Sequence, residues 1–99
     1  MESGINADIL VCRTEHDISK EIKNKLALFC NVDVDSVIQS KDASTIYDVP
    51  LMMEQEKLDT VVLRKLDISN FSSTNMSNWT KFVNRLKFPK NTVNVGLIG

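Results

Sequence analysis

The chain has 99 residues, an ordinary length for one small domain. Hydrophobic residues make up 42% of it and charged residues 25%, which is close to globular averages and excludes a disordered tail. With 13 acidic and 12 basic residues the net charge is −1, and this balance argues against a general nucleic-acid binder, which would carry a basic excess.

The sequence also gives expectations about compartment and metals. No stretch approaches the roughly 20 apolar residues of a membrane span, and the first residues lack the features of a signal peptide. We therefore expect a cytoplasmic protein without membrane contacts. Cys12 and Cys30 lie in apolar runs and are expected to be buried thiols, with a disulfide as the alternative. With the distant His16 they lack the spacing of a zinc site, so no metal ligand is predicted.

The first forty residues predict a strand, a helix and a second strand. The apolar run 9–12 is typical of a strand covered on both faces, as in a parallel sheet. Ser19 is a favourable N-cap for the helix that follows. The apolar face of that helix is expected to hold Ile22, Leu26 and Phe29. Residues 36–40 are the second strand, which completes a right-handed βαβ unit with parallel strands.

Two shorter helical segments are predicted next. Residues 46–49 suggest one helical turn, and Pro50 suits the first position of the helix after it. Another helix is expected over residues 59–66, with Asp59 as its N-cap. Its inward-facing residues would be Val62, Leu63 and Leu66.

The last third predicts a linker and a final strand. Residues 67–78 are rich in Ser, Asn and Thr, which is typical of a linker. A helix is expected over residues 78–87, ended by Pro89. Its apolar stripe would be Trp79, Phe82, Val83 and Leu86. Residues 93–99 predict one terminal strand. Because a lone strand leaves both edges unpaired, we expect the chain to be a piece of a larger protein.

These elements predict an α/β fold, with a partial parallel sheet followed by helices, a linker helix and a terminal strand. Ligands bind at the carboxyl ends of parallel strands. Arg13 follows the first strand and Lys41 and Asp42 follow the second, so the three are expected at one edge. Arg13 could stack on a base or bind a phosphate, and the backbone from Lys41 to Ala43 could bind a flat heterocycle. The alternative, slightly favoured by the residue chemistry alone, is a solvated strand end.

Other candidate residues have structural interpretations. Lys25 alone on a helix is usually a solvated charge, and Tyr47 and Trp79 are interpreted as packing residues. A basic set could contact RNA or an acidic partner, but a solvated helix face is the preferred interpretation. That set is Lys81, Arg85, Lys87 and Lys90. No phosphate loop, nucleophile elbow or Cys–His pair is found, so no catalytic residue is predicted.

Several strings of this sequence strongly resemble the CTP synthase family. The most specific are Lys-Leu-Ala-Leu-Phe-Cys-Asn-Val at 25–32 and Ile-Tyr-Asp-Val-Pro-Leu at 46–51. The similarity also includes Asp-Ile-Leu-Val-Cys-Arg at 8–13 and Val-Asn-Val-Gly-Leu-Ile-Gly at 93–99. It therefore covers nearly the whole chain.

The resemblance implies an enzyme of two domains. An amidoligase domain with a Rossmann-like sheet of the P-loop type is coupled to a class I glutaminase domain. ATP, with Mg²⁺, phosphorylates O4 of the uracil of UTP, and ammonia from glutamine then displaces the phosphate to give CTP. GTP activates glutamine hydrolysis, CTP inhibits, and the enzyme is a homotetramer with UTP sites between subunits.

The resemblance also implies a domain division. Residues 1–66 would be the C-terminal part of the amidoligase domain and 67–91 the interdomain linker. Residues 92–99 would be the first strand of a truncated glutaminase domain. The magnesium ligands and the catalytic groups are expected outside this chain, so the chain alone should be inactive. The alternative is a non-catalytic nucleotide-binding or interaction module.

Site residues follow from the resemblance in the same way. Lys25 matches a lysine that contacts UTP and inhibitory CTP, and Phe29 would lie near the CTP base. The ATP adenine site would be formed by Arg13, Lys41, Asp42 and Ala43.

Several positions depart from the family pattern that the resemblance implies, among them Ala7 and Val34, where proline is frequent. Ala43 replaces a frequent valine beside the adenine, which would loosen the packing there. Lys57 stands where glycine usually ends a helix, and a left-handed conformation at that position would cost about 1 kcal/mol.

Overall fold

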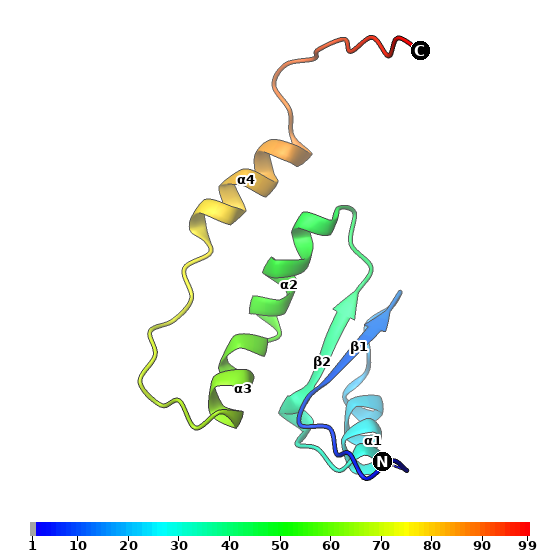
Figure 1. The fold of residues 1–99 in the computed structure, drawn as a ribbon, viewed down its shortest axis with the longest axis vertical. Coiled ribbons are helices and arrows are strands. Elements are labelled where there is room, and N and C mark those ends of the chain that lie inside the picture. Colours follow the sequence, from blue (N-terminus) through cyan, green and yellow to red (C-terminus); the bar gives the residue numbers. More distant parts are fainter. Residues whose placement is uncertain (1) are drawn as a thin grey trace.

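The computed structural model describes residues 2–99, and the elements below are those of this range. Two strands, four α-helices and two 3₁₀ turns follow one another along the chain (Figure 1). In order they are β1 Leu10–Thr14, α1 Lys20–Cys30, η1 Val34–Ser36, β2 Val37–Lys41, η2 Ile46–Asp48, α2 Val49–Gln55, α3 Leu58–Lys65 and α4 Ser77–Lys87. The predicted α/β class is confirmed.

The two strands form a parallel pair connected through α1, as the βαβ pattern predicted. Their register places Leu10 opposite Val37 and Thr14 opposite Lys41. The ladder continues one residue further, because the backbone N–H of Asp42 donates to the carbonyl of Thr14 at 2.9 Å. Figure 1 shows α1 on one side of the strands and α2 and α3 on the other. The carboxyl ends of both strands therefore meet at one edge.

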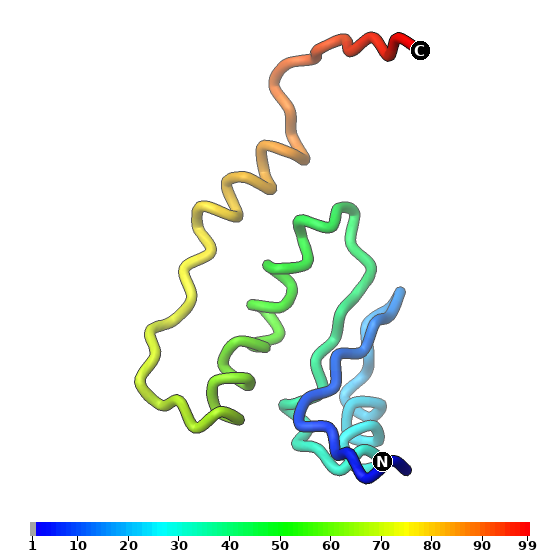
Figure 2. The backbone as a smooth tube through the Cα atoms, in the orientation of Figure 1, coloured from blue at the N-terminus to red at the C-terminus, as the bar shows by residue number. Residues whose placement is uncertain are grey.

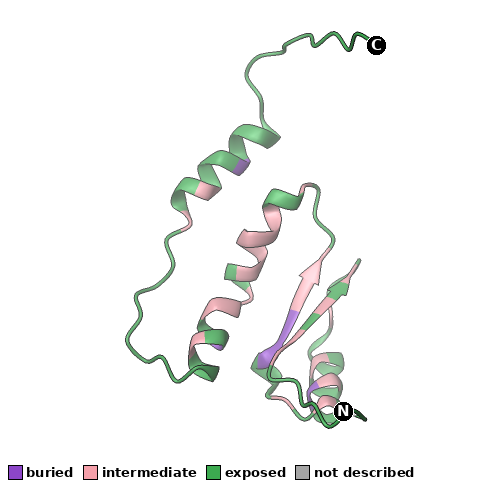
Figure 3. Ribbon diagram, in the orientation of Figure 1, coloured by how far each residue is buried: buried purple, intermediate pink, exposed green. Residues whose placement is uncertain are grey.

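The core is small and centres on the start of β2 (Figure 3). Val37 and Ile38 are each only 1% exposed. Successive strand residues point to opposite faces, so both faces of β2 are covered here. In contrast, Val11 on β1 is 55% exposed. The expectation that the first strand is covered on both faces was wrong, because within residues 2–99 nothing packs over Val11.

Helix α1 begins as predicted but turns a different face inward. The Ser19 hydroxyl accepts a hydrogen bond from the backbone N–H of Ile22 at 3.3 Å, which confirms the N-cap. Ala27 is the buried residue of the helix, whereas Ile22 and Phe29 are 51% and 73% exposed. The predicted inward face was therefore wrong for these two residues. A small residue at the contact lets the helix lie close to the sheet.

Helices α2 and α3 are separated at Lys57, which has a left-handed conformation with φ of 58° and ψ of 32°. Pro50 lies in the first turn of α2, as predicted. Asp59 is not the N-cap of α3, since the helix begins at Leu58 and Lys57 occupies the cap position. Asp59 instead lies in the first turn, where the helix dipole favours a carboxylate.

The inward face of α3 also differs from the prediction. Val61 is its buried residue, whereas Val62 and Leu66 are exposed. The left-handed residue Lys57 changes the direction in which α3 leaves α2. The spacing of apolar residues along the sequence does not show that change, so it does not tell which face of α3 is buried.

Helix α4 agrees closely with the predicted range 78–87. Val83 is its buried residue, while Phe82 and Leu86 of the predicted stripe are exposed.

The predicted terminal strand is absent, and residues 91–99 are irregular and extend away from the rest of the chain (Figure 2). A strand requires a hydrogen-bonded neighbour, and within residues 2–99 none lies beside this segment.

Two further sequence expectations concern cysteines and membrane spans. Cys12 and Cys30 are free thiols and half-buried, so the disulfide alternative is wrong and full burial is not reached. Among residues 2–99, none of the helices has the length and apolar character needed to cross a membrane.

Candidate functional site

The carboxyl ends of β1 and β2 border a shallow pocket of about 390 Å³. Its walls come from the two strand ends and from the start of α2. They are formed by Arg13, Ser40, Lys41, Asp42, Ala43, Ile46 and Val49. All four residues predicted for the adenine site thus lie around one pocket.

The cations at this edge are each paired with a carboxylate. Nε of Arg13 lies 3.3 Å from Oδ1 of Asp42 in an exposed pair, with the Arg13 side chain 86% exposed. Nζ of Lys41 donates to Oδ2 of Asp17 at 2.9 Å. Exposed pairs contribute little stability, about 0–1 kcal/mol. Their main effect here is to orient the side chains and to balance the charge of the pocket.

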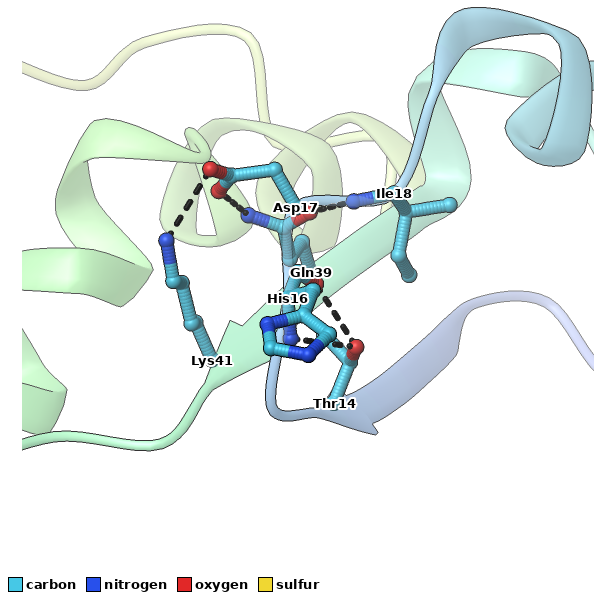
Figure 4. A network of polar contacts seen from close by, with 6 residues as sticks. All are labelled: Thr14, His16, Asp17, Ile18, Gln39 and Lys41. Carbon is cyan, nitrogen blue, oxygen red and sulfur yellow. Dashed lines mark hydrogen bonds and ion pairs between the residues drawn. The ribbon is translucent and has the colours of Figure 1, made fainter.

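Asp17 belongs to a polar network next to the pocket, shown in Figure 4. Nε2 of Gln39 donates to Oδ1 of Asp17 at 3.0 Å, and Oε1 of Gln39 accepts from the backbone N–H of Ile18. The hydrogen bond from Lys41, followed by that from Gln39, holds the pKa of Asp17 below its ordinary value. The network therefore fixes both the loop after β1 and the Lys41 side chain.

The loop after β1 is also ordered from within. The Thr14 hydroxyl donates to the carbonyl of His16 at 2.7 Å and accepts from the His16 backbone N–H at 3.2 Å (Figure 4). His16 is exposed at this turn, and it takes part in these two hydrogen bonds through its backbone.

Glu56, at the end of α2, contacts both α1 and the edge of β2 that is not paired with β1. Its Oε2 accepts from Nζ of Lys23 at 2.7 Å and from the backbone N–H of Gln39 at 3.0 Å. Burial alone would raise the pKa of Glu56, but the hydrogen bonds from Lys23 and from the Gln39 backbone outweigh it and leave the pKa lowered. The carboxylate thereby occupies a backbone donor on the open edge of β2.

Sequence reasoning did not identify Asp17, Gln39 or Glu56. The one available signal was Gln39, a polar residue in an apolar strand, since a half-buried amide requires hydrogen-bond partners. Its partners lie 17 to 22 residues away along the chain, so only the fold identifies them.

Lys25 and Phe29 lie elsewhere, on the exposed face of α1. A shallow pocket of about 410 Å³ there is formed by Glu21, Ile22, Asn24, Lys25 and Leu28. No residue belongs to both this pocket and the one at the strand ends. Ile22, Leu28 and Phe29 form an exposed apolar face, which is typical of a contact surface.

The described residues do not fit a magnesium site. Across residues 2–99 there is no group of three or more His, Cys, Asp or Glu side chains arranged to hold a metal ion. Asp17 and Asp42 at the strand ends are each engaged by a cation.

Comparison with known proteins identifies the family. A family model described as the CTP synthase N-terminus matches residues 1–68. Among curated relatives, a CTP synthase of Flavobacterium johnsoniae is 62% identical over 99 residues, and one of Flavobacterium psychrophilum is 56% identical over the same length. A CTP synthase of Methanocaldococcus jannaschii is 48% identical over 96 residues.

These matches cover all or nearly all of this chain, which spans about 18% of the length of each of the three relatives. They include the strings at 25–32 and 46–51 within the range of the family model. The chain belongs to the CTP synthase family.

Proposed function

We propose that this chain forms the adenine side of the ATP site in an enzyme that makes CTP from UTP, ATP and glutamine. The observation that carries the proposal is the pocket at the strand ends, where Arg13, Asp42 and Ala43 meet. Both cations there are already paired with carboxylates, so the pocket has no free positive charge for a phosphate. A neutral, flat base suits it better than a triphosphate.

The proposed contacts follow from the chemistry of the pocket. The exposed guanidinium of Arg13 can stack on one face of the base. Backbone N–H and C=O groups from Lys41 to Ala43 can bind its edge, and Ile46 and Val49 supply apolar surface. The small Ala43 leaves room at this edge.

The exposed face of α1 is the proposed second binding surface. Lys25 would contact the UTP or CTP nucleotide, with Phe29 near the base. Support comes from the exposure of Phe29 and its apolar neighbours Ile22 and Leu28. The same apolar face suits contact with another subunit of the homotetramer.

The chemical step is proposed to lie outside this chain. The Mg²⁺ that accompanies ATP, the glutamine site and the GTP site would be formed by other parts of the enzyme. The chain would then position nucleotides and hold the linker, which leaves phosphorylation and amination to the rest of the protein.

An NMR titration with adenosine tests the proposal. Backbone signals of Asp42 and Ala43 should shift with a Kd on the order of 1 mM, about 4 kcal/mol, because the pocket is open on one side. ATP should bind no more tightly than adenosine. An Ala43→Leu substitution should abolish the shifts by filling the pocket.

The matched control is Ala7→Leu, an exposed alanine outside the pocket. This variant should bind adenosine like the unmodified chain. The proposal is wrong if adenosine leaves residues 40–43 unperturbed, and the charge argument is wrong if ATP binds at micromolar concentration.

A further inference from the structure

The 3₁₀ turn η2 presents different residues to two parts of the molecule. A 3₁₀ helix has three residues per turn, so residues i and i+3 lie on the same side. Ile46, which opens η2, and Val49, the first residue of α2, are such a pair, and both form the wall of the strand-end pocket. Tyr47 and Asp48, between them, instead contact α4.

Helix α4 contacts this turn through a hydrogen bond and an ion pair. Nε1 of Trp79 donates to the carbonyl of Tyr47 at 2.9 Å. Nζ of Lys87 lies 2.7 Å from Oδ1 of Asp48, whose side chain is only 14% exposed. Aromatic contacts add to these, because the ring of Phe82 meets that of Tyr47 edge to face at 5.2 Å and that of Trp79 at 5.3 Å.

The turn has few bonds of its own. Asp48 N–H donates to the carbonyl of Thr45 at 3.0 Å, and the Ser44 hydroxyl donates to Oδ2 of Asp48 at 3.1 Å. A helical turn of three residues is not stable in isolation. The turn runs directly into α2, which begins at Val49. The placement of Ile46 and Val49 therefore rests on this junction and on what lies against Tyr47 and Asp48, which is α4.

Helix α4 depends on the same contacts. It is joined to α3 by the irregular segment 66–76 and followed by the irregular segment 88–99. In Figure 1 it lies near the end of α2 that follows η2, and the segment between α3 and α4 loops away from both helices. Its position therefore rests on side-chain contacts, those with η2 and the burial of Val83 among them, rather than on a short connection.

We propose that Trp79 and Lys87 are positioning residues for the strand-end pocket. They hold η2 so that Ile46 and Val49 form the pocket wall. Coupling between two sites is reciprocal, so a molecule in the pocket stabilises the docked position of α4 to the same extent. The identity of that molecule as an adenine nucleoside rests on the proposed function, whereas the link between α4 and the wall does not.

A ligand-free experiment tests the link directly. Methyl NMR of the 99-residue chain follows Ile46 and Val49 in Lys87→Met, which removes the ion pair and keeps a good helix former. The methyl signals of Ile46 and Val49 should shift. They should remain in place in Lys87→Arg, which restores the pair, and in Lys81→Met, which removes an exposed lysine of the same helix that pairs with no residue of 2–99.

The outcome does not depend on nucleotide binding. Unchanged Ile46 and Val49 signals in Lys87→Met, with α4 still helical by circular dichroism, would overturn the proposal. Equal shifts in Lys87→Met and Lys81→Met would overturn it as well, because the effect would then be a general one of charge.

A second experiment tests reciprocity with adenosine as the probe. Trp79 is the one tryptophan of the chain, so its indole N–H gives a single unambiguous signal. This signal should shift in step with that of Ala43, and Lys87→Met should weaken adenosine binding by about fivefold or more.

The two proposals fail in different ways. If adenosine moves no pocket signal, the proposed function is wrong, and the ligand-free result still decides whether α4 positions the wall. If adenosine moves the Ala43 signal and leaves the Trp79 indole in place, the positioning role is wrong and nucleotide binding stands.

Discussion

At the scale of single residues, Lys57 has a backbone conformation that few side chains adopt. Its left-handed backbone separates α2 from α3, and its N–H donates to the carbonyl of Glu54 at 2.9 Å. A side chain with a Cβ is strained in this conformation by roughly 1 kcal/mol. The resemblance predicts glycine here, and the left-handed conformation of Lys57 is one that glycine adopts without strain.

Replacing Lys57 by glycine is expected to stabilise the chain by up to about 1 kcal/mol, because the steric strain disappears while the turn is kept. Lys57→Ala, which retains Cβ, should bring no comparable gain. Urea denaturation of the three proteins measures the difference in the free energy of unfolding. Equal stability of the glycine and alanine variants would show that the backbone at this position is not strained.

Some residues of the site could be predicted from the sequence and others could not, depending on how far away in the chain their partners lie. Arg13, Lys41 and Asp42 could be placed at one edge because carboxyl ends of parallel strands meet there. Asp17 and Glu56 could not be found, since their roles come from partners more than 15 residues away in sequence. Whether the four predicted residues bind ATP stays a prediction.

At the scale of elements, Glu56 is the polar contact that ties α1, α2 and β2 together. One carboxylate oxygen accepts from Lys23 on α1 and from the backbone of Gln39 on β2. Both side chains of the ion pair are mostly buried, with 24% and 27% exposed. An unpaired strand edge invites association, and this carboxylate occupies one of its donors.

Substituting Glu56 by glutamine should destabilise the chain by about 1 kcal/mol, because the charge-assisted bond to Lys23 is lost. Glu54→Gln, in the last turn of α2 just before Glu56, is the matched control, since that residue is exposed, and it should have little effect. Thermal denaturation at neutral pH measures both. Similar melting temperatures for the two variants would refute the role of Glu56 as the connecting residue.

The orientation of α1 shows why the buried face of a helix was harder to predict than the residues at which the helix begins and ends. Its start at Ser19 follows from local capping chemistry. Its buried face could have been either of two apolar stripes, because Leu26 belongs to both and the helix carries apolar residues around much of its circumference. Close approach to the sheet selects the stripe with the small Ala27, and Ile22 and Phe29 remain outside.

At the scale of the whole molecule, the chain is extended. Its radius of gyration is 18.1 Å, compared with about 13 Å for a compact domain of 100 residues. The longest dimension is 53 Å. Many large apolar side chains are exposed, among them those of the C-terminal segment and of α1. These surfaces fit a segment that completes its packing against other parts of a larger protein.

The isolated 99-residue chain is expected to form no CTP from UTP, ATP and glutamine with Mg²⁺. Its two proposed nucleotide surfaces are shallow, and residues 2–99 bring together no metal-binding cluster. Chromatographic detection of CTP measures this, with a whole CTP synthase as the positive control. Turnover by the chain alone would contradict the assignment of the chemical step to other parts of the enzyme.

The sequence by itself determined the positions of the strands and helices, the parallel βαβ unit and the family, because capping, periodicity and characteristic strings are local properties. Tertiary structure decided which helix faces are buried, how Asp17, Gln39 and Glu56 are paired, and that α4 lies against η2. It also decided that residues 93–99 form no strand here, although their composition favours one. Strand formation needs a hydrogen-bonded partner, and the presence of a partner is a property of the fold rather than of the segment. Arg13, Lys41 and Asp42 lie around one pocket at the strand ends, as the sequence predicted, and their charges are balanced by pairs between residues 24 to 29 positions apart.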